Sequence, residues 1–213
     1  IYFVWLKQAP SAIQQTVFVI GKLVQFVAIP ILAWTLLRPW QFGWPTWNRQ
    51  TVSWGVIIGS LIGATIILPC VGWLIPNGWF NEMSVIMRQK LAGFGLQSPG
   101  AFLGLAICYT IIHSGAEEYY WRWFVDRAAR PLGTGISLLI SSAGFTAHHI
   151  VVIAEYLGYA NPWTYFASLG VGIGGGLWAI MDRRQGTIAG AWISHGLVDA
   201  ALFYVGWCIL NCS

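Results

Sequence analysis

The sequence predicts an all-α fold, a polytopic bundle of transmembrane helices, from its hydrophobic content, its few charges and the length of its apolar runs. Of the 213 residues, 57% are hydrophobic and only 8% are charged, whereas soluble domains carry about 25% charged residues. The apolar runs are about 20 residues long, the length of a membrane-spanning helix. Strands of a membrane barrel would instead alternate over about 10 residues.

Six spanning helices and one helix at the membrane surface follow from the apolar pattern. The predicted spans cover residues 13–37, 52–74, 100–123, 135–154, 162–181 and 187–209. Between the second and third spans, residues 80–91 predict an amphipathic helix that lies in the membrane interface. We expect a single membrane domain, with N-terminal segments over residues 1–99 and a catalytic core over residues 100–213.

The basic residues of the loops predict the orientation in the membrane, because Lys and Arg are enriched in cytoplasmic loops. One side has six of them and the other has three. The first set is Arg38, Arg49, Arg127, Arg130, Arg183 and Arg184, and the second is Lys7, Arg88 and Lys90. The side of the first set is therefore predicted to be cytoplasmic.

Nucleic-acid and nucleotide binding are poorly supported. The net charge is only +4, and the basic residues form no run of the kind that contacts phosphates. The glycines over residues 170–176 lie inside an apolar span and lack the Lys-Ser/Thr of a phosphate loop. They are small residues at four-residue spacing, which is typical of closely packed membrane helices.

Strongly polar residues inside the predicted spans are few and concentrated. All but Lys22 fall in the third, fourth and sixth spans. They are Lys22, His113, Glu117, Glu118, Arg122, His148, His149, His195 and Asp199. Ionisable groups at membrane depth are costly, and they usually mark a functional site.

Helical spacing divides these residues into a bracing pair and a candidate site. Glu118 and Arg122 are four residues apart, so we expect them to share a helix face and form a structural ion pair. His113 and His148 are interpreted as hydrogen-bonding residues between helices. The remaining ionisable groups come from three helices and predict a shared hydrated pocket. They are Glu117, His149, His195 and Asp199.

Three short motifs in this order resemble those of the CPBP family, which comprises CAAX prenyl endopeptidases and bacteriocin-processing proteins, formerly the Abi family. They are Glu117-Glu118-x-x-x-Arg122, Phe145-x-x-x-His149 and His195-x-x-x-Asp199. The resemblance covers about half of the chain. It implies an integral membrane protease whose site opens toward the cytoplasm, and whose substrate is a membrane-tethered peptide or protein.

The resemblance also implies roles for the individual residues. Glu117 and His149 would hold and activate the attacking water, and His195 with residue 199 would stabilise the oxyanion. Glu118, Arg122 and Phe145 would support them. The mechanism implied is glutamate-dependent and requires no cofactor.

The third motif of the family ends in Asn or Asp, and this chain has Asp199 at that position. An ionised aspartate cannot donate a hydrogen bond to an oxyanion. Asp199 therefore carries a proton, or orients His195, or helps to bind a metal. Glu117, His149, His195 and Asp199 are acceptable zinc ligands, so a zinc site is an alternative, although no HExxH motif is present.

Our prediction is an intramembrane endopeptidase that hydrolyses a peptide bond of a prenylated C-terminus, a leader peptide or a similar substrate. The alternative is a non-proteolytic scaffold or accessory subunit of a larger membrane complex. A proton-coupled transporter is a third hypothesis, disfavoured because the sequence has no inverted repeat.

Overall fold

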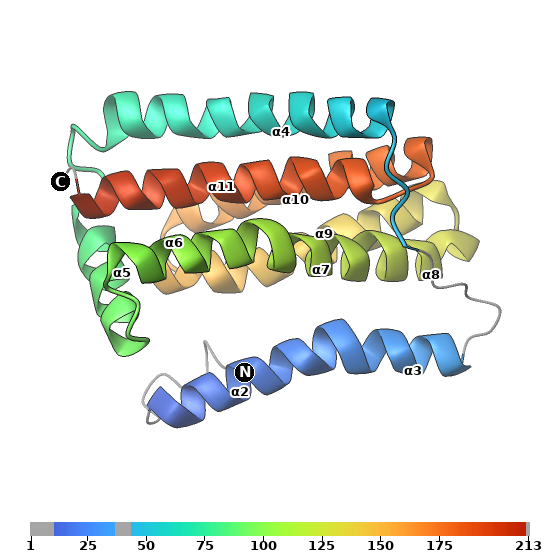
Figure 1. Ribbon diagram of the computed structural model, residues 1–213, viewed down its shortest axis with the longest axis horizontal. Coiled ribbons are helices and arrows are strands. Elements are labelled where there is room, and N and C mark those ends of the chain that lie inside the picture. Colours follow the sequence, from blue (N-terminus) through green and yellow to red (C-terminus); the bar gives the residue numbers. More distant parts are fainter. Residues whose placement is uncertain (1–10, 37–43, 212–213) are drawn as a thin grey trace. The chain divides into compact units, whose positions relative to one another are not determined.

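The computed structural model describes residues 11–36 and 44–211, and its regular elements are all helical within these ranges (Figure 1). The all-helical class predicted from the sequence is therefore confirmed. Lys7, Leu37 and Arg38, which enter the predictions of the first span and of the orientation, lie outside the described residues.

Five described helices are long and apolar enough to cross a membrane. They are Arg49–Leu74, Pro99–Leu132, Thr134–Leu157, Pro162–Gln185 and Ala189–Asn211. These helices match the second to sixth predicted spans. The predicted first span is also helical, as α2 (Ser11–Leu23), η1 (Val24–Ala28) and α3 (Ile29–Leu36), but its apolar stretch, Val19–Ala28, is shorter than a span.

The chain forms two compact units. Among the described residues, the first unit comprises those up to Pro45 together with Tyr119–Gly176, and the second comprises Thr46–Glu118 together with the chain from Leu177 onward. Each unit therefore combines segments from distant parts of the sequence. The predicted division at residue 99 stays a prediction.

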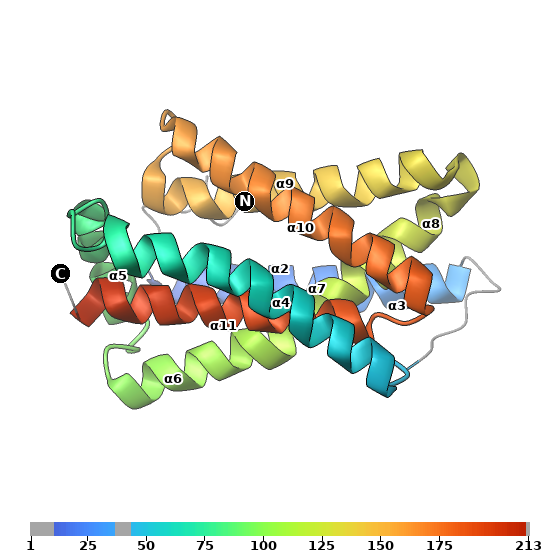
Figure 2. The ribbon, with the colours of Figure 1, turned by 90° about the horizontal axis from the view of Figure 1, so that it is seen from above.

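The second unit is built on two helices, α4 (Arg49–Pro69) and α11 (Ala189–Asn211), which lie side by side (Figures 1 and 2). Three buried glycines of α4 face α11: Gly55, Gly59 and Gly63. A Cβ atom on Gly55 would lie 2.7 Å from the carbonyl oxygen of Gly190. Small residues at four-residue spacing thus bring the two backbones together, as is common between membrane helices.

A third helix of this unit runs along α11 and carries the two adjacent glutamates. It comprises α6 (Pro99–Ile107), the π-helical segment η3 (Cys108–His113) and α7 (Ser114–Glu118). Ser98 caps its start, because its Oγ accepts a hydrogen bond from the backbone N–H of Ala101. In Figure 2, α11 lies between α4 and α6.

A short helix, α5 (Asn81–Gly93), closes one end of this unit. It confirms the helix predicted over residues 80–91, while the predicted position in the membrane interface stays a prediction. The guanidinium of Arg88 donates a hydrogen bond to the carbonyl of Leu210 in the last turn of α11. This bond satisfies a carbonyl that has no partner within its own helix.

The first unit packs the π-helical segment η4 (Tyr119–Asp126) against α9 (Thr134–Leu157). The short α8 (Arg127–Ala129) and η5 (Arg130–Leu132) lead from η4 into a turn at Gly133, whose φ of 103° suits a glycine. The hydroxyl of Ser141 donates to the carbonyl of Trp121 over 3.0 Å. A Cβ on Gly144 would lie 2.6 Å from the Trp121 ring, so a glycine is needed at this contact.

The helix α10 (Pro162–Gln185) contributes residues to both units. Its glycines pack against α9 in the first unit: a Cβ on Gly172 would meet the hydroxyl of Thr146, and one on Gly175 would lie 2.9 Å from the Phe145 ring. The predicted packing role of the glycines therefore holds at these two positions.

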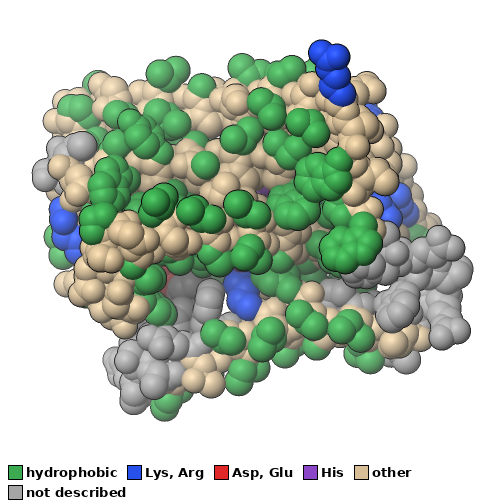
Figure 3. Space-filling view, viewed as in Figure 1, with side chains coloured by type: hydrophobic (Ala, Val, Ile, Leu, Met, Phe, Trp, Pro, Cys, Tyr) green, Lys and Arg blue, Asp and Glu red, His purple; other side chains and the backbone are tan. Residues whose placement is uncertain are grey.

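Exposed hydrophobic side chains are frequent, as expected for helices that face lipid. On α4, Leu61 is 63% exposed and Leu68 is 71% exposed. Figure 3 shows hydrophobic side chains along this helix. A water-soluble protein rarely exposes so large an apolar surface, so the side chains agree with an integral membrane protein.

Candidate active site

The two adjacent glutamates lie in one short α-helical stretch, α7, between two π-helical segments. Glu117 is 2% exposed and Glu118 is 0% exposed. Single π-helical turns inside α-helices are rare and frequently occur at functional sites. The carboxyl groups are thus buried at a point where the backbone departs from regular α-helix on both sides.

Close packing between α7 and α11 brings these glutamates to His195. A Cβ on Gly196 would lie 2.5 Å from the carbonyl oxygen of Thr110, and one on Gly115 would lie 2.5 Å from the Trp192 ring. The hydroxyl of Ser114 donates to the same Thr110 carbonyl over 2.6 Å. Gly115 and Gly196, which have no side chains, therefore allow the η3–α7 segment and α11 to approach each other closely.

His195 lies among three carboxyl groups. Its Nδ1 atom is hydrogen-bonded to Oε1 of Glu118 at 2.8 Å. Its Nε2 atom lies 3.8 Å from Oε2 of Glu117 and 3.7 Å from Oδ1 of Asp199. Both ring nitrogens therefore face acidic groups, and His195 itself is only 3% exposed.

Glu117 in turn lies between two imidazole rings. Its Oε2 faces His195, and its Oε1 lies 3.3 Å from Nε2 of His113, one turn earlier on the same helix. The His113 ring contacts Tyr109 edge-on, with ring centroids 4.5 Å apart. From the sequence we interpreted His113 only as a hydrogen-bonding residue between helices. In the structure it is a direct neighbour of Glu117.

The other three predicted site residues belong to the first unit, where Arg122 and His149 both contact the ring of Phe145. Phe145 is fully buried. The guanidinium of Arg122 lies 4.5 Å above the centre of this ring, an arrangement in which the cation is attracted to the aromatic face. The His149 ring lies 4.4 Å from the same ring. The two named residues of the second motif, Phe145 and His149, are therefore in contact.

The hydrogen bond of His149 defines its tautomer. Its Nδ1 donates to the backbone carbonyl of Phe145 over 2.9 Å. A carbonyl oxygen can only accept, so Nδ1 carries the hydrogen, and in the neutral ring Nε2 holds the lone pair. Such a nitrogen suits an acceptor of a hydrogen bond from water.

The structure thus brings together Glu117, Glu118, His195 and Asp199 in the second unit, and Arg122, Phe145 and His149 in the first. The predicted convergence of His149 with Glu117 stays a prediction. The predicted ion pair of Glu118 with Arg122 assumed regular α-helical spacing, whereas the backbone is π-helical from Tyr119; it too stays a prediction.

Sequence reasoning missed two residues that contact His195 or its surroundings. The indole of Trp178 stacks on the imidazole of His195, with ring centroids 4.2 Å apart. The indole N–H donates to the hydroxyl of Ser194 over 2.9 Å. The polar neighbours His195 and Asp199 gave no sign of this contact, because a tryptophan inside an apolar span has no characteristic spacing from a distant histidine.

The acidic cluster contains residue types that also bind metal ions. In the parts of the chain that the structure describes, no group of three or more His, Cys, Asp or Glu side chains is arranged to hold a metal ion. The donor types at Glu117, His195 and Asp199 remain chemically suitable for zinc.

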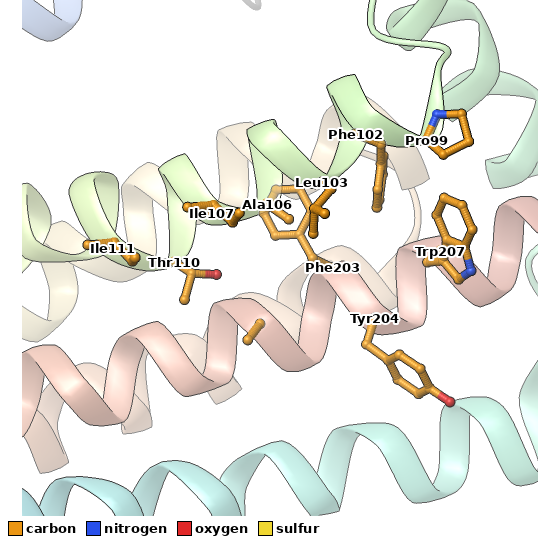
Figure 4. A pocket seen from close by; sticks show the side chains of 11 residues that line it. Pro99, Phe102, Leu103, Ala106, Ile107, Thr110, Ile111, Phe203, Tyr204 and Trp207 are labelled. Carbon is orange, nitrogen blue, oxygen red and sulfur yellow. The ribbon is translucent and has the colours of Figure 1, made fainter.

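An apolar groove of about 540 Å³ runs along α11 in the second unit. Figure 4 shows Phe102, Leu103 and Ile107 on one wall and Phe203, Tyr204 and Trp207 on the other. Thr110 and Ala200 also line the groove.

Comparison with known proteins gives a family match for part of the chain. The model of a family described as Type II CAAX prenyl endopeptidase Rce1-like matches residues 99–201. No curated protein and no solved structure matches the chain. The matched segment includes every predicted site residue: Glu117, Glu118, Arg122, Phe145, His149, His195 and Asp199.

The order of the three motifs, the helices that carry them and this family match agree with one another. Residues 99–201, just under half of the chain, match this family model, which supports the predicted resemblance to the CPBP family of membrane proteases.

Proposed function

We propose that this protein is an intramembrane endopeptidase that hydrolyses a peptide bond of a membrane-associated substrate with a water activated by Glu117 and His149. The observation that carries the proposal is the position of Glu117. Its buried carboxyl lies between the imidazoles of His113 and His195. Burial makes a carboxylate a stronger base than it is in water, which suits a general base in hydrolysis.

In the proposed reaction, a water oxygen attacks the carbonyl carbon of the scissile peptide bond. Glu117 takes one proton from this water as the bond between oxygen and carbon forms. The tetrahedral intermediate then collapses, the bond between carbon and nitrogen breaks, and the proton held by Glu117 passes to the leaving amine. Glu117 is thus restored in each cycle.

His195 stabilises the oxyanion of the tetrahedral intermediate in this mechanism. For that role Nε2 must carry a hydrogen. The nitrogen on the other side, Nδ1, is already hydrogen-bonded to Glu118. A ring with hydrogens on both nitrogens can donate to Glu118 and to the oxyanion at once, and the surrounding carboxyl groups are suited to balance its charge.

His149 completes the proposed site as the second residue that holds the water. Its Nδ1 hydrogen is bound to the Phe145 carbonyl, so Nε2 of the neutral ring would accept a hydrogen bond from the water. Arg122, beside the same Phe145 ring, fixes the surroundings of His149. This part of the proposal requires that His149 come within reach of a water on Glu117.

The proposed substrate has a hydrophobic portion and a peptide bond near the membrane surface. A prenylated C-terminus agrees with the family, and a leader peptide is a second candidate. The groove beside α11 is lined almost entirely by apolar side chains and would accommodate the hydrophobic portion. We place the opening of the site on the cytoplasmic side, because the loop residues Arg127 and Arg183 lie there by the charge argument.

We further propose that no metal takes part, and that zinc is the alternative to be excluded by experiment. Proton transfer by Glu117 and charge stabilisation by His195 supply the two functions that a zinc ion would otherwise provide.

The test is cleavage of a peptide with a prenylated cysteine near its C-terminus by the purified protein in lipid nanodiscs, followed by mass spectrometry. We expect cleavage by the wild-type protein and none by Glu117→Gln, with equal thermal unfolding of both. Glu82→Gln on the exposed face of α5 is the matched control. Equal cleavage by Glu117→Gln would rule out the glutamate as base.

The same assay addresses the non-proteolytic alternative. A wild-type protein that cleaves neither the prenylated peptide nor an unprenylated leader peptide, while remaining folded, would favour a scaffold or accessory subunit.

A further inference from the structure

The flat face of His195 is covered by an indole ring from a different helix. The Trp178 ring on α10 lies parallel to the imidazole, with an interplanar angle of 14° and ring centroids 4.2 Å apart. Trp178 is 3% exposed. Both residues belong to the second unit, so the contact lies within one compact part of the protein.

The indole is itself held in place. Its N–H donates to the hydroxyl of Ser194 over 2.9 Å, and Ser194 is fully buried. Ser194 is fixed by the close approach of α4, since a Cβ on Gly59 would lie 2.8 Å from its Cα atom. Three helices therefore determine where the face of Trp178 lies.

The stacking of Trp178 restricts a rotation of the His195 ring that the hydrogen bond to Glu118 does not restrict. A single bond from Nδ1 to Glu118 fixes one direction in the plane of the ring, but the ring can still turn about that direction. A parallel indole fixes the plane itself. Together the two contacts aim Nε2 at the space beside Glu117 and Asp199.

The indole also affects the charge that the imidazole can carry. The face of a tryptophan ring attracts cations, more strongly than other aromatic rings do. An imidazole with hydrogens on both nitrogens is a cation, and this is the form that donates to Glu118 and to an oxyanion at the same time. An aliphatic side chain in place of Trp178 would cover the ring without this attraction.

We infer that Trp178, anchored by Ser194, is a positioning residue that holds the imidazole of His195 in the plane needed for oxyanion stabilisation. The inference rests on the proposed function for its catalytic meaning. The orientation of the ring, however, can be tested whether or not the protein is a protease.

Three variants separate the parts of this contact. Trp178→Leu removes the aromatic face, Trp178→Phe keeps a face but loses the N–H donor, and Ser194→Ala keeps the indole but removes its anchor. Trp54→Leu is the matched control, because Trp54 is a 49% exposed tryptophan of α4. All four are compared with wild type in lipid nanodiscs.

The kinetic readout is kcat and KM for the prenylated peptide. A displacement of about 1 Å in a catalytic group can cost ~100-fold in rate, so we expect a fall in kcat of this order in Trp178→Leu with KM little changed. Trp178→Phe should recover most of kcat because the aromatic face is restored. A purely structural role would instead lower the melting temperature and kcat together.

The direct readout is the nitrogen NMR spectrum of the His195 side chain, assigned by comparison with His195→Gln. In wild type we expect both ring nitrogens to carry hydrogens and to give sharp signals. Trp178→Leu should broaden these signals or shift them toward the neutral ring, Ser194→Ala should do so more weakly, and Trp54→Leu should leave them unchanged.

The two readouts distinguish failure of this inference from failure of the proposed function. If wild type cleaves no peptide but the His195 signals change in Trp178→Leu, the proposed function fails and the positioning role stands. If the His195 signals and kcat are unchanged in a folded Trp178→Leu protein, the positioning role is overturned. If Trp178→Leu does not fold, unchanged His195 signals in Ser194→Ala overturn it.

Discussion

Oε1 of Glu118 and Nδ1 of His195 are joined by a hydrogen bond of 2.8 Å between α7 and α11. Glu118 is 0% exposed and His195 is 3% exposed. The second glutamate of the pair therefore directly holds the candidate oxyanion-stabilising residue. A change at Glu118 is expected to affect both the stability of the protein and the orientation of His195.

Glu118→Ala should lower the apparent melting temperature in detergent, because it removes one partner from a buried hydrogen bond. Leaving a buried polar group without its partner costs about 1–3 kcal/mol, and more for a charged group. Glu118→Gln retains an acceptor oxygen and should lose less stability. The measurement is thermal unfolding followed by tryptophan fluorescence.

Glu82→Ala provides the control, since Glu82 is an exposed acidic residue of α5 in the same unit. It should unfold like wild type. A Glu118→Ala protein as stable as the control would show that the bond to His195 contributes nothing to the fold.

The sequence predicted the helices well, because each consists of an apolar run long enough to cross a membrane. The second motif pointed to Phe145 and His149, which are in contact on the regular α-helix α9. The predicted ion pair of Glu118 with Arg122 assumed a regular α-helix, whereas the backbone is π-helical from Tyr119, and it stays a prediction. A change of helical period has no clear signal in the residues themselves.

Contacts between distant helices were the other limit. The motifs indicated that His195 belongs to a site, but not that Glu118 rather than Asp199 would bind its Nδ1. The stacking of Trp178 on His195 depends on how α10 packs against α11. A single sequence contains no periodicity that relates residues on two separate helices, so this contact required the structure.

Asp199→Asn should retain activity on the prenylated peptide, and its kcat should equal or exceed that of wild type. The Asp199 carboxyl lies 3.7 Å from Nε2 of His195, where an oxyanion would form. An amide at this position can donate a hydrogen bond, whereas an ionised carboxyl repels the developing charge. The measurement is kcat for the variant and wild type at one pH.

A general acid or base contributes about 10²–10⁴-fold to a rate. A fall of that size in Asp199→Asn, with the fold intact, would mean that the Asp199 carboxyl itself takes part in proton transfer.

Gly59→Ala should destabilise the second unit. A Cβ at this position would lie 2.8 Å from the backbone of Ser194, so α4 and α11 must move apart. Overpacking of this kind typically costs about 1–3 kcal/mol. Because Ser194 anchors Trp178, we expect kcat to fall as well, which is measured with the prenylated peptide.

Gly104→Ala is the control for this change. Gly104 lies on α6, and a Cβ there would meet nothing within 4 Å. Its melting temperature should equal or exceed that of wild type, since alanine favours a helix. If Gly59→Ala is equally stable, the close contact between α4 and α11 does not limit the packing.

Removal of metal ions should leave the proteolytic rate unchanged. The hydrogen bond from His195 to Glu118 resembles the carboxylate contacts that also orient histidine ligands of zinc, so the residue types alone do not decide the mechanism. The experiment compares cleavage before and after dialysis against a chelator, and measures zinc per protein molecule by mass spectrometry. We expect equal rates and far less than one zinc per chain. Loss of activity on chelation, restored by added zinc, would instead assign Glu117, His195 and Asp199 as ligands and make the metal the activator of the water.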